Sequence, residues 1–468
     1  MTQSDSYPSV EEAIARLVVD LTYENISAEA LGSVRRLLED QLALQVGCVP
    51  LPWNQAVLNL TRASHAPGRS HITMAGFDTF SAADAAFVNA TYGHSFEYDD
   101  AHEASYSHPG SCVVSAAIAL GEELEVSMRE VITGLVAGYE VYARIGILIG
   151  PEMLKRGYHP HAQLSNFGAA AVAAKMRGLS FEQTLNALSI AMSHASGTTE
   201  YTSGGGSVKR LHSGIGSRNG INSATMAAAG ITGPPGFLTG SKGWASTFIQ
   251  QTIPASAAEL FGLDRTFEIM NVCFKSYCCC FLNHAYIDGA QELHGRTDDI
   301  ESVVLRIQPG NDVVVGNRNE NAYAPKTLDH LQYSLPFQFS LALAGYGNGF
   351  TTHHRYFDGM LDIGPGSDVA VLAEKTIIVP APELDERYPG KWVADIEVHH
   401  ATGGIEHVFV DGPGGTADKP VSQEQLDEKY RDLTLAPLGA DGSAALLVAI
   451  KTLDPDQTVG RFASLLQA

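Results

Sequence analysis

Long stretches of the first 266 residues are apolar and rich in alanine and glycine, with few polar positions between them. VVSAAIALGEELEV, VITGLVAGYEVYARIGILI and GAAAVAAKMRGL show this pattern most clearly. Ser81, Ser127, Ser180 and Ser422 each stand three residues before Asp, Glu or Gln, a spacing typical of a capping box at the start of a helix. Helices with many small residues pack closely against other helices. The pattern therefore predicts a large all-helical domain.

The pattern changes over residues 267–412, where short β-branched runs alternate with turn residues. SVVLRIQPG and KTIIVPAP each predict a strand, and KWVADIEVHH with GIEHVFVDG predicts a β-hairpin. Helix-like segments such as LDHLQYSLPFQFSLALAGYG lie between the strands. We expect a mainly α fold in which 1–266 and 413–468 form a helical domain and 267–412 forms a smaller α+β domain.

Size and charge restrict the function classes. A chain of 468 residues exceeds the usual size of one core, so two domains are expected. The formal net charge of -22 would repel nucleic acid and anionic membranes, so we expect neither as a partner. The same field opposes an anionic substrate, so a pocket for a carboxylate has to gather Lys and His locally. The sequence shows neither a continuous apolar run of ~20 residues nor a secretory signal, which predicts a soluble, cytoplasmic protein.

The cysteines do not suggest a metal site. They are Cys48, Cys112, Cys273 and the run 278–280, without the paired spacing of zinc ligands or the density of a disulfide scaffold. An iron–sulfur cluster is disfavoured because side chains of adjacent residues diverge. A zinc hydrolase would need an HExxH motif or a comparable ligand set, which the sequence lacks. We expect reduced thiols and no metal.

The densest group of ionisable residues is the segment NATYGHSFEYDDAHEASYSHPGS, residues 89–111. An exposed acidic loop with incidental histidines is one interpretation. Its position between two apolar helical segments favours the other, a loop that presents acid/base groups to a pocket. Its ionisable residues are His94, Glu97, Asp99, Asp100, His102, Glu103 and His108.

A second candidate segment is RGYHPHAQLSNFG, in which Tyr158, His159 and His161 precede an apolar helix. Backbone amides and the helix dipole at such a position favour an anion, so a carboxylate is a suitable ligand there. A His-x-His loop without any ligand is the alternative.

Two further segments combine lysine with histidine. GGGSVKRLHSG contains Lys209 and His212 but lacks the spacing of a phosphate-binding loop, so we discount nucleotide binding. FKSYCCCFLNH contains Lys275 and His284 near the expected domain junction.

The order of these motifs resembles the MmgE/PrpD family over nearly the whole chain. The motifs are NAxxGHxxxxDD, HPG, GYE, YHPH with FGAAAVAAKMRGL, GSVKRLHSG, NGINSA, GITGP and LQYSLPF. The resemblance implies a helical domain built from both chain ends, an inserted α+β lid domain and a homodimer. Family members include 2-methylcitrate dehydratase, cis-aconitate decarboxylase and iminodisuccinate epimerase. They transfer a proton at a carbon next to a carboxylate and need no metal or organic cofactor for it.

The resemblance also implies roles for individual residues. Lys209 and Lys275 would anchor a carboxylate, His159 would be the principal acid/base group, and Asp100 with His108 would form a second acid/base pair. A buried Asp beside a His fixes its tautomer and raises its basicity. The pocket around these five residues would be lined by Glu97, Ala101, His102, Tyr158, His212, Cys280 and Phe337.

Three positions depart from the pattern of the cis-aconitate decarboxylases. Their DFDDT motif corresponds to Glu97-Tyr98-Asp99-Asp100-Ala101 here, so the threonine hydroxyl is missing. Cys280 replaces a histidine, and Phe337 replaces a tyrosine of the lid. Losing a hydroxyl, an imidazole and a phenol predicts a less polar pocket and a substrate with an apolar part.

The predicted function is a cofactor-independent lyase, with dehydration of a small carboxylic acid related to 2-methylcitrate as the first expectation. Dehydration needs a base, positive charge beside the carboxylate and an acid for the departing hydroxyl. The same groups also support epimerisation or decarboxylation, and the sequence does not choose among these outcomes. A noncatalytic binding homologue is the alternative from another class, and the presence of all five candidate catalytic residues argues against it.

Overall fold

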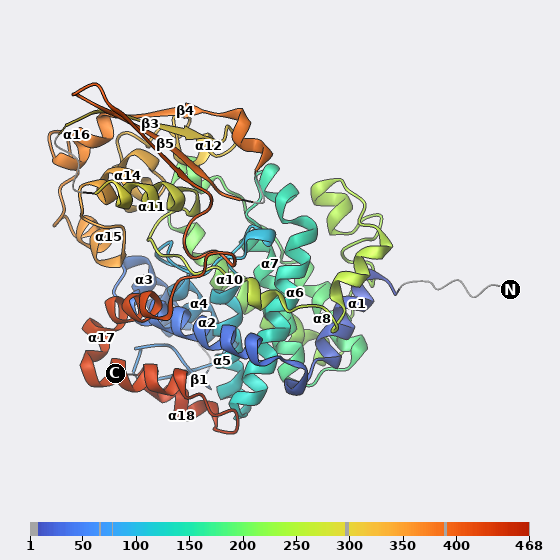
Figure 1. Ribbon diagram of the computed structural model, residues 1–468. Coiled ribbons are helices and arrows are strands. Elements are labelled where there is room, and N and C mark those ends of the chain that lie inside the picture. The colour runs from blue at the N-terminus through green and yellow to red at the C-terminus, as the bar shows by residue number, and fades with distance from the viewer. Residues whose placement is uncertain (1–7, 65–66, 77, 295–298, 388–390, 468) are drawn as a thin grey trace.

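A computed structural model describes residues 8–64, 67–76, 78–294, 299–387 and 391–467 of the chain. Helices dominate and the strands are few, which confirms the predicted mainly α fold (Figure 1). The helices before residue 230 are α1 (Val10–Asp20), α2 (Ala28–Gly47), α3 (Pro52–Ser64), α4 (Ala82–Gly93), α5 (Pro109–Leu124), α6 (Met128–Lys155), α7 (Pro160–Met176), α8 (Phe181–Met192), α9 (Tyr201–Gly204) and α10 (Val208–Ala228).

The predicted helix starts are confirmed. Ser127, Ser180 and Ser422 form capping boxes, and the Ser81 hydroxyl accepts a hydrogen bond from the backbone N–H of Asp84. These contacts satisfy backbone amides that the first helical turn leaves without a partner.

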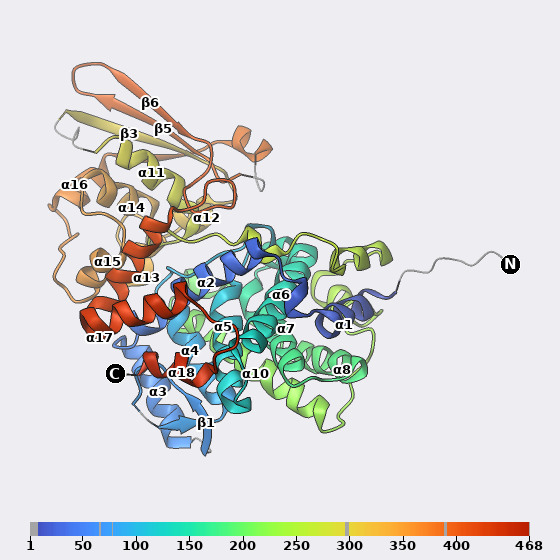
Figure 2. The ribbon, with the colours of Figure 1, turned by 60° about the horizontal axis from the view of Figure 1, so that its bottom comes forward.

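Helices α4, α5, α6, α7 and α10 pack against one another in the centre of the molecule (Figure 2). Small residues permit this close packing. A Cβ atom on Gly220 of α10 would lie 2.5 Å from the backbone nitrogen of Ala170 in α7. A Cβ atom on Gly138 of α6 would lie 2.3 Å from a methyl group of Val172. Close backbone approach therefore fixes the positions of the helices that carry the candidate site.

A short hairpin, β1 (Pro67–His71) with β2 (Thr79–Phe80), lies within the helical part, where the sequence pattern indicated almost no strands. It packs on α5, where the Ser70 hydroxyl donates to the carbonyl of Ala119 and His71 pairs with Glu122.

The later part of the chain contains a four-stranded sheet of order β4-β3-β5-β6. β3 and β4 are parallel, and the other pairs are antiparallel, so the predicted β5–β6 hairpin is confirmed. Helices α11 and α14 lie beneath the sheet, around an apolar cluster separate from that of the helical part (Figure 2). The elements are α11 (His284–Glu292), β3 (Ile300–Ile307), α12 (Asp312–Val315), α13 (Leu328–Gln332), α14 (Leu335–Leu343), α15 (Phe350–Phe357), α16 (Asp368–Glu374), β4 (Thr376–Pro380), β5 (Ala394–His400) and β6 (Ile405–Val410).

The chain then returns to the helical part. α17 (Gln423–Lys451) packs against α2, and α18 (Val459–Ala463) packs against α5. Both ends of the chain thus contribute to the helical layer.

Two helices, α6 and α17, are long and apolar enough to cross a membrane by length and composition. In α6, 89% of the apolar window is buried inside the protein, as in a core helix. In α17 only 28% is buried, and non-helical dihedrals at Gly439 (φ 68°) interrupt the helix. Leu435 and Val448 of α17 are therefore part of an exposed apolar face.

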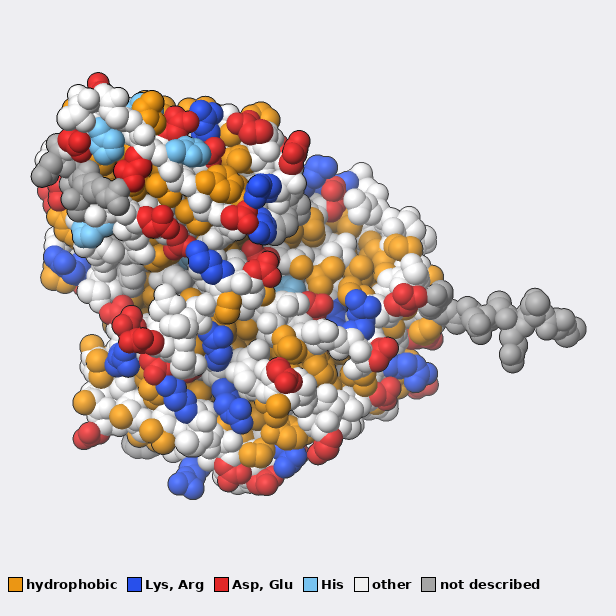
Figure 3. Space-filling view, viewed as in Figure 1, with side chains coloured by type: hydrophobic (Ala, Val, Ile, Leu, Met, Phe, Trp, Pro, Cys, Tyr) orange, Lys and Arg blue, Asp and Glu red, His pale blue; other side chains and the backbone are white. Residues whose placement is uncertain are grey.

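On the face of the molecule shown in Figure 3, acidic and basic side chains are interspersed.

Gly220→Ala should lower the free energy of unfolding by about 1–3 kcal/mol, because the added methyl group overpacks the contact between α10 and α7. The matched control is Gly32→Ala in α2, where the methyl group enters open space. Removing a glycine from a helix should raise stability there by up to about 1 kcal/mol. Urea unfolding followed by circular dichroism measures both, and equal effects would contradict the packing argument.

Candidate active site

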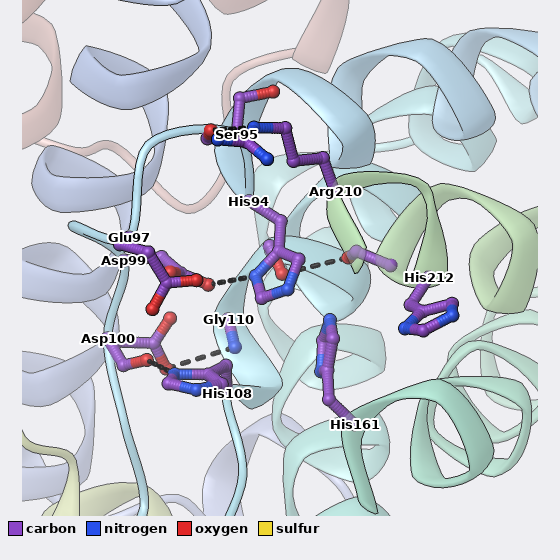
Figure 4. A network of polar contacts seen from close by, with 12 residues as sticks. His94, Ser95, Glu97, Asp99, Asp100, His108, Gly110, His161, Arg210 and His212 are labelled. Atoms are coloured by element: carbon purple, nitrogen blue, oxygen red, sulfur yellow. Dashed lines mark hydrogen bonds and ion pairs between the residues drawn. The ribbon is translucent and has the colours of Figure 1, made fainter. Parts of the chain in front are cut away.

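The acidic segment between α4 and α5 faces the starts of α7 and α10, and its side chains meet theirs in the interior (Figure 4). Five histidines lie here in one group, which we call the histidine cluster: His94, His108, His159, His161 and His212. Ring centroids are 4.2 Å apart for His94 and His161 and 4.9 Å for His159 and His212. His108 and His159 immediately precede α5 and α7, where a proline at the first helical position begins each helix.

The histidines of the cluster are neutral. Burial is the main cause that lowers the pKa of each ring, and nearby cationic side chains and histidines lower the pKa further for His94, His159 and His161. For His212, burial and then Lys209 lower the pKa to about 4. A neutral imidazole retains a lone pair, so the cluster supplies bases rather than positive charge.

His108 is held in one tautomer, although not by the predicted partner. Its Nδ1 donates to the backbone carbonyl of Asp100 at 2.8 Å, so its Nε2 carries the lone pair. The Asp100 carboxylate instead accepts hydrogen bonds from the Gln41 amide (2.9 Å) and the backbone N–H of Gly110 (3.0 Å). Asp100 therefore contacts the His108 ring through its backbone carbonyl and not through its carboxylate.

Within the histidine cluster, Asp99 and His94 form a carboxylate–imidazole pair, in which Oδ2 and Nδ1 are 2.6 Å apart. Both residues belong to the ionisable segment of residues 89–111. The Nε2 atoms of His94 and His161 are buried without a hydrogen-bond partner among the described residues. His161 Nδ1 contacts the hydroxyl of Tyr142 at 2.7 Å.

Lys209 and Lys275 lie on either side of Glu97. One carboxylate oxygen of Glu97 pairs with Lys209 and the other lies 3.3 Å from the Lys275 ammonium, which also donates to the Glu97 carbonyl at 3.0 Å. All three residues are at most 5% exposed. Burial, Lys275 and Arg210 lower the pKa of Lys209, and Cys280 and Asp329 oppose this shift. The Glu97 carboxylate is the anionic group paired directly with the Lys209 ammonium.

The remaining pair of predicted residues contacts directly. His159 Nδ1 lies 2.8 Å from His212 Nδ1, so one ring donates and the other accepts. Lys209 and His212 both lie near the start of α10, and His212 faces the acidic segment across the site (Figure 4).

Three predicted pocket residues make their contacts elsewhere. His102 pairs with Glu268 at 3.2 Å, and the Tyr158 ring packs on Phe248 with centroids 5.6 Å apart. Ala101 bonds through its backbone to Cys273 and packs in a small apolar cluster.

The two other departures from the family pattern lie in different surroundings. Cys280 is close enough to Lys275 and Lys209 for both to oppose the rise in the pKa of its thiol, which burial causes. Phe337 is buried in an apolar cluster with Leu331 and Leu341 of its own part of the chain. Among the described residues, no group of three or more His, Cys, Asp or Glu side chains is arranged to hold a metal ion.

Lys429 of α17 is a positioning residue that the sequence analysis missed. Its buried ammonium pairs with Asp40 of α2 at 2.5 Å. It also donates to the backbone carbonyls of Tyr98 (2.5 Å) and Lys275 (3.2 Å). Lys429 thereby joins the segment that carries Glu97 to the segment that carries Lys275.

Comparison with known proteins agrees with this arrangement. Residues 12–256 match the MmgE/PrpD N-terminal domain and residues 277–454 match the MmgE/PrpD C-terminal domain. The chain belongs to the MmgE/PrpD family. The resemblance found in its motifs is thus confirmed.

Similar proteins include cis-aconitate decarboxylases. The enzyme of Aspergillus terreus is 26% identical over 64% of this chain, an alignment that covers 62% of that enzyme. The human enzyme is 25% identical over 79% of this chain and 76% of its own length. The cis-aconitate decarboxylase-like protein oryM of Aspergillus oryzae is 24% identical over 100% of this chain and 99% of its own. The chain therefore spans less than two thirds of the Aspergillus terreus enzyme.

Lys429→Met should destabilise the protein by about 3–5 kcal/mol, because it leaves the Asp40 carboxyl buried without its cation. The double variant Lys429→Met with Asp40→Asn removes both charges and should recover much of this loss. Urea unfolding of the two single variants and the double variant measures the coupling. Losses that simply add would show that the pair is not coupled.

His212→Gln should reduce the sensitivity of the protein to acid. The folded-state pKa of about 4 lies below the ordinary value of 6.5, so as pH falls the unfolded state binds this proton first. Stability is therefore lost between about pH 6.5 and 4. Between pH 7 and 5 the variant should lose about 1–2 kcal/mol less than the wild type. Chemical unfolding at both pH values tests this, and equal losses would contradict a neutral His212.

Proposed function

We propose that the protein is a cofactor-independent lyase that moves a proton at the carbon next to the carboxylate of a small carboxylic acid. The observation that carries this proposal is the buried lysine pair, Lys209 and Lys275, which lies close enough to the neutral histidine cluster for both lysines to lower the pKa of His94. Fixed positive charge stabilises the enolate-like carboxylate that forms when the proton leaves. Neutral imidazoles in the same site accept and return protons.

The geometry favours His108 as the base and His159 as the acid in a dehydration. The lone pair on His108 Nε2 is fixed by the hydrogen bond at its other nitrogen, so this atom takes the proton next to the carboxylate. The hydroxyl leaves from the neighbouring carbon with a proton from His159, and a double bond forms between the two carbons. His212 holds the tautomer of His159 through their 2.8 Å contact. Asp100 positions His108 through its backbone carbonyl.

Decarboxylation is the second candidate outcome, and the names of the similar fungal and mammalian enzymes favour it. In that case the bond to one carboxylate breaks, carbon dioxide leaves, and the remaining carbanion takes a proton from a ring N–H group of the histidine cluster. Lys209 and Lys275 stabilise the same negative charge in both reactions. Both are lyase reactions, and an epimerase would use the same proton transfer without losing a fragment.

We also propose that the protein acts as a homodimer in the cytoplasm, without a nucleic-acid or membrane partner. The exposed apolar face of α17, which includes Leu435 and Val448, offers a surface for a second copy. The net charge of -22 supports the exclusion of nucleic acid.

Incubation with a panel of hydroxylated and unsaturated carboxylic acids in deuterated water tests the proposed reaction. We expect deuterium next to a carboxylate in at least one acid, and mass spectrometry then distinguishes loss of water, loss of carbon dioxide and epimerisation. His159→Gln should slow this exchange by about 100-fold to 10,000-fold, because it removes a positioned acid/base group.

The control for that experiment is His400→Gln at the end of β5, outside the cluster, which should leave the rate unchanged. Circular dichroism verifies that both variants are folded. If the wild type exchanges deuterium into no acid of the panel, the enzyme proposal is wrong and the protein is a noncatalytic homologue.

A further inference from the structure

The Glu97 carboxylate lies where the lysine pair would otherwise receive a carboxylate from a ligand. It bridges Lys209 and Lys275 with one oxygen directed to each ammonium. The Lys209 ammonium has no other hydrogen-bond partner among the described residues, and Lys275 donates only to the carbonyl and carboxylate of Glu97 among the contacts described. The protein thus supplies one carboxylate to this site itself.

The charges around the pair leave little room for a highly charged ligand. Two lysines and one glutamate give a net charge of one positive unit. The nearest other cations are already engaged, since Arg210 pairs with Asp329 at 2.6 Å and Lys429 pairs with Asp40. The histidine cluster is neutral and adds no positive charge. Burying a carboxylate without a cation costs several kcal/mol. The site therefore favours a ligand with few carboxylate groups.

The backbone and the length of Glu97 both contribute to this arrangement. Its φ is 56°, in the left-handed region that side chains other than glycine rarely adopt. Such strain persists where the surroundings hold the residue in place, here through both lysines and through the Lys275 bond to its carbonyl. The DFDDT motif of the cis-aconitate decarboxylases has the shorter aspartate at this position, and the extra methylene of glutamate lets the carboxylate reach further from the backbone toward the lysines.

We propose that Glu97 permanently occupies one carboxylate position of the lysine pair and so makes the enzyme selective for mono- and dicarboxylic acids over tricarboxylic acids. This inference rests on the proposed function, because it assigns Lys209 and Lys275 to substrate binding. It separates this protein from enzymes that act on cis-aconitate, which carries three carboxylates. Glu97 is then the residue that limits how many carboxylates an accepted substrate can carry.

Binding of unreactive acids tests the proposal without any turnover. Glutarate carries two carboxylates and propane-1,2,3-tricarboxylate carries three. Isothermal titration calorimetry should show that the wild type binds glutarate more tightly than propane-1,2,3-tricarboxylate. Glu97→Gly suits the left-handed backbone and vacates the position, so it should bind the tricarboxylate at least about 10-fold more tightly than the wild type does. Glu97→Gln removes the charge but keeps the volume and should gain less.

Acetate provides a second and independent measurement. In Glu97→Gly, added acetate should fill the vacated position and compete with the tricarboxylate. Acetate should not weaken tricarboxylate binding in the wild type or in Glu97→Gln. The control variant is Glu122→Gln, a buried glutamate paired with His71 on α5, which should bind both acids as the wild type does.

The outcomes separate this inference from the proposed function. If Glu97→Gly gains no affinity for the tricarboxylate and does not respond to acetate, Glu97 does not occupy a carboxylate position and the inference is wrong. If Glu97→Gly does not fold, a tricarboxylate affinity of Glu97→Gln equal to that of the wild type overturns it. If the binding results are as expected but no acid exchanges deuterium, the selectivity stands and the lyase proposal falls.

Discussion

The buried ammonium of Lys429 is the contact on which the geometry of the site depends. It comes from a helix near the carboxyl end, pairs with Asp40 of α2 and bonds the backbone next to Glu97 and at Lys275. A buried charge is tolerated only when its hydrogen-bonding groups have partners. The N–H groups of Lys429 that do not bond Asp40 bond the carbonyls of Tyr98 and Lys275 and so hold these two segments together. The ion pair around Glu97 is therefore positioned by a residue that contacts the backbone of its members and neighbours and none of its charged groups. Both ends of the chain are needed to bring Lys209 and Lys275 to one place.

Burial sets the chemistry of the site as well as its shape. The same low polarity that keeps the histidines neutral makes an isolated lysine ammonium unfavourable, and Glu97 compensates for it. Neutral bases and cations therefore coexist in one site because a carboxylate lies between the two lysines.

The sequence predicted the parts of the structure that local rules determine. Capping residues located the helix starts, alternation located the β5–β6 hairpin, and family motifs indicated the residues that gather at the site. The direction of a side chain within an irregular loop follows no such rule, so the sequence could not show that the Asp99 carboxylate contacts His94 while the Asp100 carboxylate accepts from Gln41. Lys429 could not be identified because its partners lie far away in the sequence. The β1–β2 hairpin was missed because β2 has only two residues.

The enclosure of the site has a consequence for how the protein works over time. Every side chain of the lysine pair and of its glutamate is almost without contact with solvent, and Lys275 belongs to the segment that leads into the sheet-bearing part while Lys209 belongs to the helical part. For the proposed reaction, a substrate would enter and a product would leave only when these two walls separate. In such an enzyme the frequency of opening limits the turnover rate whenever the bond-breaking step is faster. The contacts that assemble the reactive groups are then also the contacts that limit the rate of product release.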